Sequence, residues 1–340
     1  MQEMKRTLSP VTVTFFLIGL FVVSCTKDEP LVPIIPTLEN PKASSFSSEV
    51  VLEWYNLFEE IDRYATGFRP PASARALAYI GLAGYEAAIP GNPDYNSFAG
   101  FYQGLELPIV TPEVRYHWPI AVNAAYYEVI KSFYPHLSQE LNIKIADTYF
   151  RLLNKWSNEV SSSVADRSKD FGTQVGRAVF EWSAKDVAGH EAYLRNHDPQ
   201  YLPPEGEGFW HPTAPDFTPA LFPYWGEVRP FAIPQRELVG NPHLPYSTSP
   251  NSQFYLQAKE VQVWADEVKA GNDYEGKWMG EFWSDDVPRQ TFTPPGRWIA
   301  IANQILDIEG LTLDEAVVLY AQMGMALCDA GITIWKSKFH

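Results

Sequence analysis

Cysteine and basic residues are scarce in this sequence. Two cysteines in 340 residues cannot form a disulfide scaffold. The chain has 26 Lys and Arg against 41 Asp and Glu, a net charge of −15, which disfavours a nucleic acid partner because the phosphate backbone would be repelled. No collagen-like period, heptad array or 34-residue repeat is present. With 46% hydrophobic residues and 11 Trp, the chain can instead bury a large core, which excludes a wholly disordered protein.

Common catalytic and metal-binding motifs are also missing. The sequence has no HExxH, no glycine-rich phosphate loop and no G-x-S-x-G elbow. Glu113 and His117 are four residues apart, as are Asp186 and His190, which is not the Glu-x-x-His spacing of di-iron bundles. The sequence therefore predicts no metal site. The histidines are at positions 117, 136, 190, 197, 211, 243 and 340.

The N-terminus resembles a bacterial lipoprotein signal. Lys5 and Arg6 precede the apolar run 11–23, and Cys25 follows it directly after Ser24. This layout predicts a signal peptide over 1–24 and acylation of Cys25, which would anchor the protein to the outer membrane of a bacterial envelope, facing the periplasm or the cell surface. The alternative is an ordinary signal peptide with an incidental cysteine. Residues 1–24 carry two bases and one acid, so their removal changes the charge from −15 to −16.

The remainder divides into a tether over 25–46 and a helical domain over 47–340. Four prolines and several serines favour an extended tether. In the domain the apolar spacing is helical and no alternation of period two persists, so we predict an all-α helical bundle. Residues 187–248 are rich in Pro, Trp and Phe and predict a long irregular segment that packs on the bundle. Helices are expected at about 48–65, 70–88, 118–134, 138–158, 161–185, 249–269, 294–309 and 312–338, with Ser48 and Thr312 as N-caps and Glu315 completing a capping box.

The last predicted helix carries an unusual lysine. On a helix Asp329, Ile332, Trp335 and Lys338 share one face, so Lys338 can point towards the interior. A lysine there needs an anion to offset its desolvation, whereas the alternative is a terminal lysine that extends to solvent. If Cys25 is lipidated, Cys328 has no internal partner and is expected to be a buried thiol.

This segment carries a resemblance to a known family. The pattern Asp-Ala-x-Ile-x-x-Trp-x-x-Lys-Phe over 329–339 resembles the vanadium-dependent haloperoxidases and their relatives in the type 2 phosphatidic acid phosphatase superfamily. Segments 75–87, 208–213 and 223–231 are similar to the family's small-residue helix and its Trp/Pro-rich loop. The resemblance covers about 50–340. It implies a helical bundle with an oxyanion site for vanadate or phosphate, in which Lys338 is the first anion-contacting residue.

The sequence also departs from the family pattern. No Pro-Ser-Gly-His occurs in it, and His340, two residues after Lys338, matches neither family histidine. The resemblance thus implies the front portion of a haloperoxidase-like or phosphatase-like lipoprotein, which alone holds no cofactor and has no turnover, with a small molecule as the substrate of the complete form. Two alternatives stay open: a cell-surface glycan-binding lipoprotein that stacks Trp and Tyr on sugars, and a structural α-helical lipoprotein. Halide preference and oligomeric state are not encoded in any recognisable motif.

Overall fold

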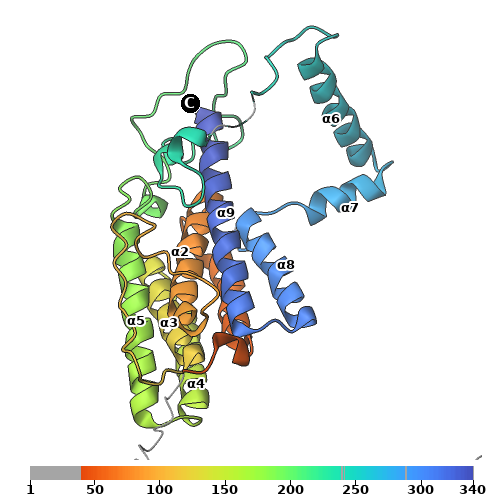
Figure 1. Ribbon diagram of the computed structural model, residues 1–340. Helices are drawn as coiled ribbons and strands as arrows, with labels where there is room; N and C mark the ends of the chain where they lie inside the picture. The colour runs from red at the N-terminus through yellow and green to blue at the C-terminus, as the bar shows by residue number, and fades with distance from the viewer. Residues whose placement is uncertain (1–39, 239, 241, 288, 340) are drawn as a thin grey trace, which may run out of the picture. The chain divides into compact units, whose positions relative to one another are not determined.

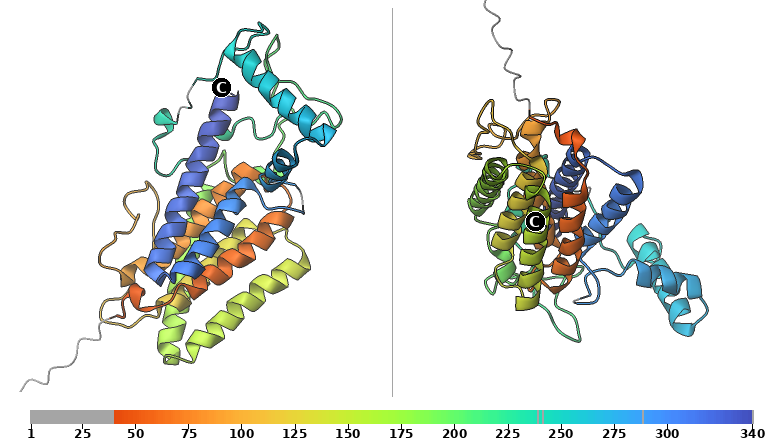
Figure 2. Two further views of the ribbon diagram at one scale, coloured as in Figure 1. Left: turned by 90° about the vertical axis from the view of Figure 1, so that its right-hand side faces the viewer. Right: turned by 90° about the horizontal axis from the view of Figure 1, so that it is seen from below.

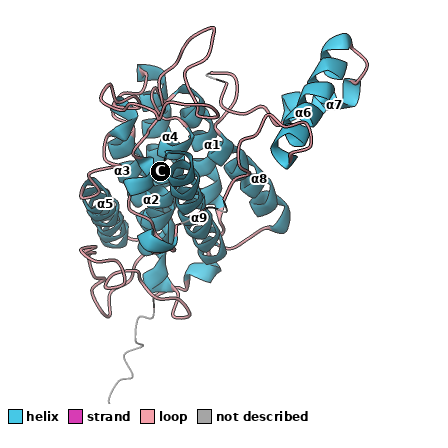
Figure 3. Cartoon of the chain, turned by 90° about the horizontal axis from the view of Figure 1, so that it is seen from above, coloured by secondary structure: helices cyan, strands magenta, loops and turns pink. Residues whose placement is uncertain are grey.

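A computed structural model of the chain describes residues 40–340, except 239, 241, 288 and 340 (Figure 1). The described part is helical and contains no β-strand, as Figure 3 shows, so the all-α prediction is confirmed. The predicted signal peptide, Cys25 and most of the tether lie outside the described residues. The α-helices are α1 (Glu49–Tyr64), α2 (Pro70–Ala88), α3 (Trp118–Phe133), α4 (Gln139–Ser157), α5 (Ser162–Ala184), α6 (Gln253–Ala270), α7 (Tyr274–Phe282), α8 (Pro294–Glu309) and α9 (Leu313–Phe339).

Helix α2 forms the centre of the bundle. Every residue of α2 after Pro70 is buried, and the helix packs on α9, α3 and α5 (Figures 1 and 2). Its small side chains allow α9 to approach closely: a Cβ added to Gly81 would lie 2.7 Å from the Tyr320 carbonyl oxygen. On the facing helix, a Cβ at Gly324 would lie 2.6 Å from the carbonyl oxygen of Leu77. The crossing of α2 and α9 therefore fixes the path of the helix that carries Lys338.

Helix α9 is long and apolar enough to cross a bilayer, judged by length and composition alone. In the bundle it instead buries one face against α2, through residues such as Val317, Tyr320 and Met325. A core helix of a globular domain meets the same criteria, so the length and hydropathy of α9 do not indicate a membrane span.

The predicted tether is too long at its C-terminal end. Asn40 donates to the Val114 carbonyl oxygen at 3.1 Å and accepts the Tyr116 amide at 2.6 Å. The Pro41 carbonyl oxygen accepts the Trp118 indole N–H at 2.6 Å. Ala43–Ser45 form a 3-10 turn in which Ala43 is buried. Residues 40–46 therefore belong to the helical domain rather than to the tether, because their backbone and side chains satisfy polar groups at the start of α3.

The predicted helices are present, but some of them begin at other residues than predicted. Ser48 precedes α1 but its side chain makes no capping bond. Helix α6 begins at Gln253 rather than at 249, and the Ser252 side chain caps it by accepting the Tyr255 amide. Only one half of the capping box forms: the Thr312 amide donates to the Glu315 carboxylate at 2.9 Å. Helix α7 was not predicted, because its nine residues are too short for a clear apolar period.

The long irregular segment is confirmed. The described residues of 187–248, which leave out 239 and 241, contain 3-10 turns at Ala192–Leu194, Trp225–Glu227 and Gln235–Glu237 and no α-helix or strand. Its aromatic residues divide into two groups: Phe222, Trp225 and Phe231 are buried, while Phe209 and Trp210 are about half exposed. The 222–231 part is thus a component of the core, and the 201–221 part lines open cavities described below.

Asp62 provides a pH-dependent test of the packing of α8 on α1. Its buried carboxylate accepts the Thr293 amide at 2.6 Å and the Thr293 hydroxyl at 2.8 Å, at the start of α8. Burial raises the pKa of Asp62, although the hydrogen bonds oppose this shift. A carboxyl whose folded-state pKa exceeds its unfolded value contributes stability below the unfolded pKa and loses it as the pH rises through the folded pKa.

We therefore expect wild type to gain stability relative to Asp62→Asn, that is, a larger free energy of unfolding, as the pH falls towards the ordinary carboxyl pKa of about 4. Urea unfolding over a pH series measures this difference. Glu315→Gln is the control of opposite sign, because hydrogen bonds from Thr312 lower the pKa of Glu315. The same pH trend for both variants would contradict the account.

Candidate functional site

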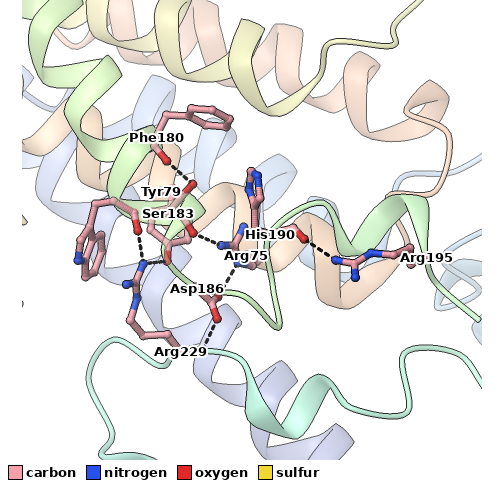
Figure 4. A network of polar contacts seen from close by, with 9 residues as sticks. Arg75, Tyr79, Phe180, Ser183, Asp186, His190, Arg195 and Arg229 are labelled. Atoms are coloured by element: carbon pink, nitrogen blue, oxygen red, sulfur yellow. Dashed lines mark hydrogen bonds and ion pairs between the residues drawn. The ribbon is translucent and has the colours of Figure 1, made fainter. Parts of the chain in front are cut away.

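A buried polar network joins the segments that resemble the haloperoxidase family. Arg75, on α2, pairs with Asp186 at 3.1 Å, and both side chains are 4% exposed (Figure 4). The same guanidinium donates to the Ser183 carbonyl oxygen at 2.7 Å, at the end of α5. Arg75 is the only charged residue of α2 before Glu86, which is a sequence signal for a buried partner.

Arg229 extends the network from the irregular segment. Its guanidinium donates to the Tyr79 hydroxyl at 2.8 Å and to the Trp182 carbonyl oxygen at 2.7 Å, as Figure 4 shows. It also lies 3.8 Å above the centre of the Trp182 ring, a close cation–π contact. Burial raises the pKa of Tyr79, and the two arginines oppose that shift, so the phenol stays neutral.

Asp329, on α9, fastens the same segment to the last helix. Its carboxylate is 1% exposed and accepts the backbone amides of Phe231, Ala232 and Ile233 at 2.8, 2.8 and 2.9 Å. Three charge-assisted bonds to consecutive amides hold the segment in one position against α9. The neighbouring Cys328 is buried, as predicted, and burial raises the pKa of its thiol.

The carboxylates of this network are paired with Arg75 or with backbone amides, and they orient the last helix. The buried Nε of Arg229, by contrast, has no hydrogen-bond partner among the described residues. The network thus joins the three segments 75–87, 223–231 and 329–339, through Arg75, Arg229 and Asp329. They hold the irregular segment against α9, and Lys338 lies about two and a half turns beyond Asp329 on the same helix.

Lys338 lies in the last turn of α9 and is exposed, so of the two alternatives the structure supports the lysine that extends to solvent. The reason is that the helix extends past the core: the face is buried at Ile332, half-buried at Trp335 and open at Lys338. Two bonds hold this end in place, from the Trp335 indole to the Leu221 carbonyl oxygen at 2.9 Å and from Lys336 to the Gln235 carbonyl oxygen at 2.9 Å. The Lys338 ammonium lies 5.6 Å from the Trp335 ring and 5.4 Å from that of Phe339.

Two cavities adjoin Lys338, and Trp210, Lys338 and Phe339 line both. One has a volume of about 500 Å³ and the other about 310 Å³. His243 and Glu207 line the larger cavity, and Asp216 lines the smaller one. The further lining of the larger cavity is mostly aromatic and proline: Tyr201, Pro203, Pro204, Phe209 and Tyr246. The further lining of the smaller cavity is mixed: Thr213, Ala214, Pro215, Thr218, Pro219, Ala220 and Leu221. The Trp/Pro-rich segment thus walls the lysine, as the resemblance requires.

The sequence alone did not single out His243. It follows Pro242 in a stretch without helical period, and only the fold brings it to the cavity of Lys338. Among the described residues no group of three or more His, Cys, Asp or Glu is arranged to hold a metal ion. Lys338 is the one Lys or Arg side chain in the linings of these two cavities, so it could bind an oxyanion on one side, and Glu207 and Asp216 oppose a second negative charge.

Comparison with known proteins agrees with this architecture. No family model and no curated protein matches the chain. A solved structure, the crystal structure of the first bacterial vanadium-dependent iodoperoxidase, superposes with a TM-score of 0.74 at 25% sequence identity. The alignment covers 86% of this chain and 69% of that one. The chain thus has the fold of a vanadium-dependent haloperoxidase. The haloperoxidase-like bundle therefore accounts for the all-α fold and for the convergence of the motif segments.

A vanadate ion at these cavities would have one lysine and one histidine as its nearest candidate donors. In this haloperoxidase-like chain, Lys338 and His243 would face the oxyanion, and the half-exposed Trp210 ring would shield one side of it. When bound, vanadate would supply a Lewis acid for the activation of peroxide. A lysine forms strong charge-assisted hydrogen bonds to such an anion, but a single lysine cannot replace its hydration shell.

Proposed function

We propose that this chain is a haloperoxidase-like lipoprotein that contributes Lys338 to a site for vanadate or phosphate. The observation that carries the proposal is the position of Lys338 between two cavities walled by the Trp/Pro-rich segment, at the end of the helix that Asp329 and Arg229 hold in place. The membrane attachment through Cys25 and the location in a bacterial envelope are part of the same proposal.

The proposal includes the absence of turnover by the 340 residues alone. In enzymes that stabilise a developing anion, removal of one hydrogen-bond donor to that anion lowers kcat by a factor of about 10²–10³. The sequence lacks the Pro-Ser-Gly-His segment, so we expect oxidation of iodide or bromide by purified chain, vanadate and peroxide to stay at the rate of vanadate alone. A saturable rate above that background, lost in Lys338→Met, would show that the chain is a complete catalyst.

Binding is the more direct test of the site. We expect vanadate and inorganic phosphate to bind in the millimolar range and to change the fluorescence of Trp335 and Trp210, because both rings adjoin Lys338. Lys338→Met should abolish the change. Lys259→Met is the matched control, since Lys259 is an exposed lysine on α6 that bonds only to Gln262 among the described residues. Equal titration curves for wild type and Lys338→Met would overturn the proposal.

A second candidate is glycan binding, favoured by the partly exposed aromatic residues of the larger cavity. Phe209, Trp210 and Tyr246 are each about half exposed there, which suits stacking on sugar rings. This function depends on the rings and not on the charge of Lys338. Oligosaccharide binding that Trp210→Ala abolishes and Lys338→Met leaves unchanged would favour it over the oxyanion site.

A further inference from the structure

The first described residues of the helical domain are attached to the start of α3 on both sides of His117. The Asn40 side chain bonds to the backbone at positions 114 and 116. The Pro41 carbonyl oxygen accepts the indole N–H at position 118. The segment 40–46 is therefore held by the residues that immediately surround one histidine.

The His117 ring is itself part of this attachment. The residue is 3% exposed. The Phe46 ring of segment 40–46 lies edge-on to the imidazole, with 4.8 Å between the ring centres, and the Trp156 ring at the end of α4 lies 6.4 Å from it. The segment thus packs on the bundle through a buried titratable side chain.

The two ring nitrogens of His117 have different surroundings. Nε2 lies 3.6 Å from the carboxylate of Glu159, a side chain that is 53% exposed. Nδ1 is buried and has no hydrogen-bond partner among the residues that the structure describes. The carboxylate favours the neutral tautomer with its proton on Nε2, which leaves a lone pair on Nδ1. A second proton would turn that lone pair into a buried N–H donor without an acceptor, an unfavourable state.

A positive charge on this ring is also disfavoured by its position in the fold. His117 directly precedes the first residue of α3 and so lies at the positive end of the helix dipole. Burial lowers the pKa of His117, Glu159 opposes this shift, and Arg115 adds to it. The ring is therefore uncharged near pH 7. Other charged side chains of the surrounding elements are engaged elsewhere or exposed: Lys155 pairs with Glu49, Arg167 donates to the Arg115 carbonyl oxygen, and Lys42 is exposed.

We propose that His117 is a pH-sensitive latch, neutral while segment 40–46 is bound and protonated when the segment is released in mildly acidic solution. Release uncovers the ring, so water can solvate the imidazolium and accept its second N–H. Because the released state binds the extra proton, the opening equilibrium rises as the pH falls below about 6.5, the ordinary pKa of histidine. The rise is at most tenfold for each pH unit and stops at the lower pKa of the closed form.

Release lengthens the chain that precedes the bundle. Seven residues span at most about 25 Å when they are extended. Under the proposed attachment through Cys25, the domain would reach further from the membrane at acidic pH, although the latch itself does not depend on that attachment. It is also independent of Lys338. The Leu313 amide, at the first turn of α9, donates to the Phe46 carbonyl oxygen at 2.9 Å, about 38 Å along the helix from Lys338.

Hydrogen exchange at residue resolution tests the latch in the full chain. The Tyr116 amide is the direct reporter, because it donates to the Asn40 side chain. We expect its protection factor in wild type to fall by about three- to tenfold between pH 7.5 and 5.5. His117→Gln should remove this pH dependence, since glutamine does not titrate in this range. His136→Gln is the matched control at an exposed histidine beyond the other end of α3, and should keep it.

Two variants of exposed residues test the latch without a change in the core. Glu159→Gln removes the carboxylate that stabilises the charged ring in the closed form, so the protection factor at pH 5.5 should fall below that of wild type. Arg115→Gln removes a repelling charge and should raise it. A wild-type protection factor that does not change with pH overturns the proposal. So does a pH dependence that persists in His117→Gln, or equal protection at pH 5.5 in wild type and both surface variants.

Discussion

Replacing Asp329 by Ala is expected to destabilise the protein by about 4 kcal/mol. The carboxylate accepts three consecutive backbone amides, of Phe231, Ala232 and Ile233, at a position that water does not reach. Truncation leaves these donors without an acceptor, and each buried unsatisfied group costs about 1–3 kcal/mol, part of which relaxation of the segment recovers. Urea unfolding at neutral pH measures the loss.

Asp307→Ala is the control for this prediction, since Asp307 lies on the exposed side of α8. It should change the free energy of unfolding by less than about 0.5 kcal/mol. A loss below about 1 kcal/mol for Asp329→Ala would contradict the view that this carboxylate fixes the irregular segment to α9.

Replacing Arg75 by Met is expected to cost about 3–5 kcal/mol, because it leaves the buried carboxylate of Asp186 without its counter-charge. The remaining partner of Asp186 is the Arg229 amide at 3.3 Å, a weak substitute for a guanidinium. The variant also loses the bond from Arg75 to the Ser183 carbonyl oxygen. Thermal and urea unfolding should both report the loss.

Two further variants separate the charge from the packing. Arg75→Met combined with Asp186→Asn should recover part of the lost stability, because the unpaired charge is then absent. Arg177→Met should cost less than about 1 kcal/mol, since the Arg177 side chain is 59% exposed and its pair with Glu128 is long, at 3.5 Å. If Arg75→Met were no worse than Arg177→Met, the buried network would not hold the fold together.

The bundle was predictable because its helices carry strong local signals. The apolar stripe of α4, with Leu141, Ile145 and Tyr149 buried, follows from periodicity alone. Pro294 and Gly310 bound α8 at its predicted ends. Helix α7 and the packing of residues 40–46 depend instead on contacts between distant segments, such as Asn40 with Tyr116, for which the sequence has no local signal.

The candidate site was only partly predictable. The resemblance identified Lys338, and its place beside the Trp/Pro-rich segment agrees with it. Helical periodicity left the environment of Lys338 open, because a shared face says nothing about where the core ends along a helix. His243 was missed since it reaches the cavity through an irregular chain path, which residue spacing cannot specify.

A crystal of the chain soaked in vanadate tests the central claim most directly. The account predicts oxyanion density in the cavity bounded by Trp210 and Phe339, with an oxygen about 2.7–2.9 Å from the Lys338 ammonium. The density should be absent in Lys338→Met crystals treated in the same way. Vanadate bound away from Lys338, for example beside Arg195 and His197 in the neighbouring cavity of about 520 Å³, would contradict it.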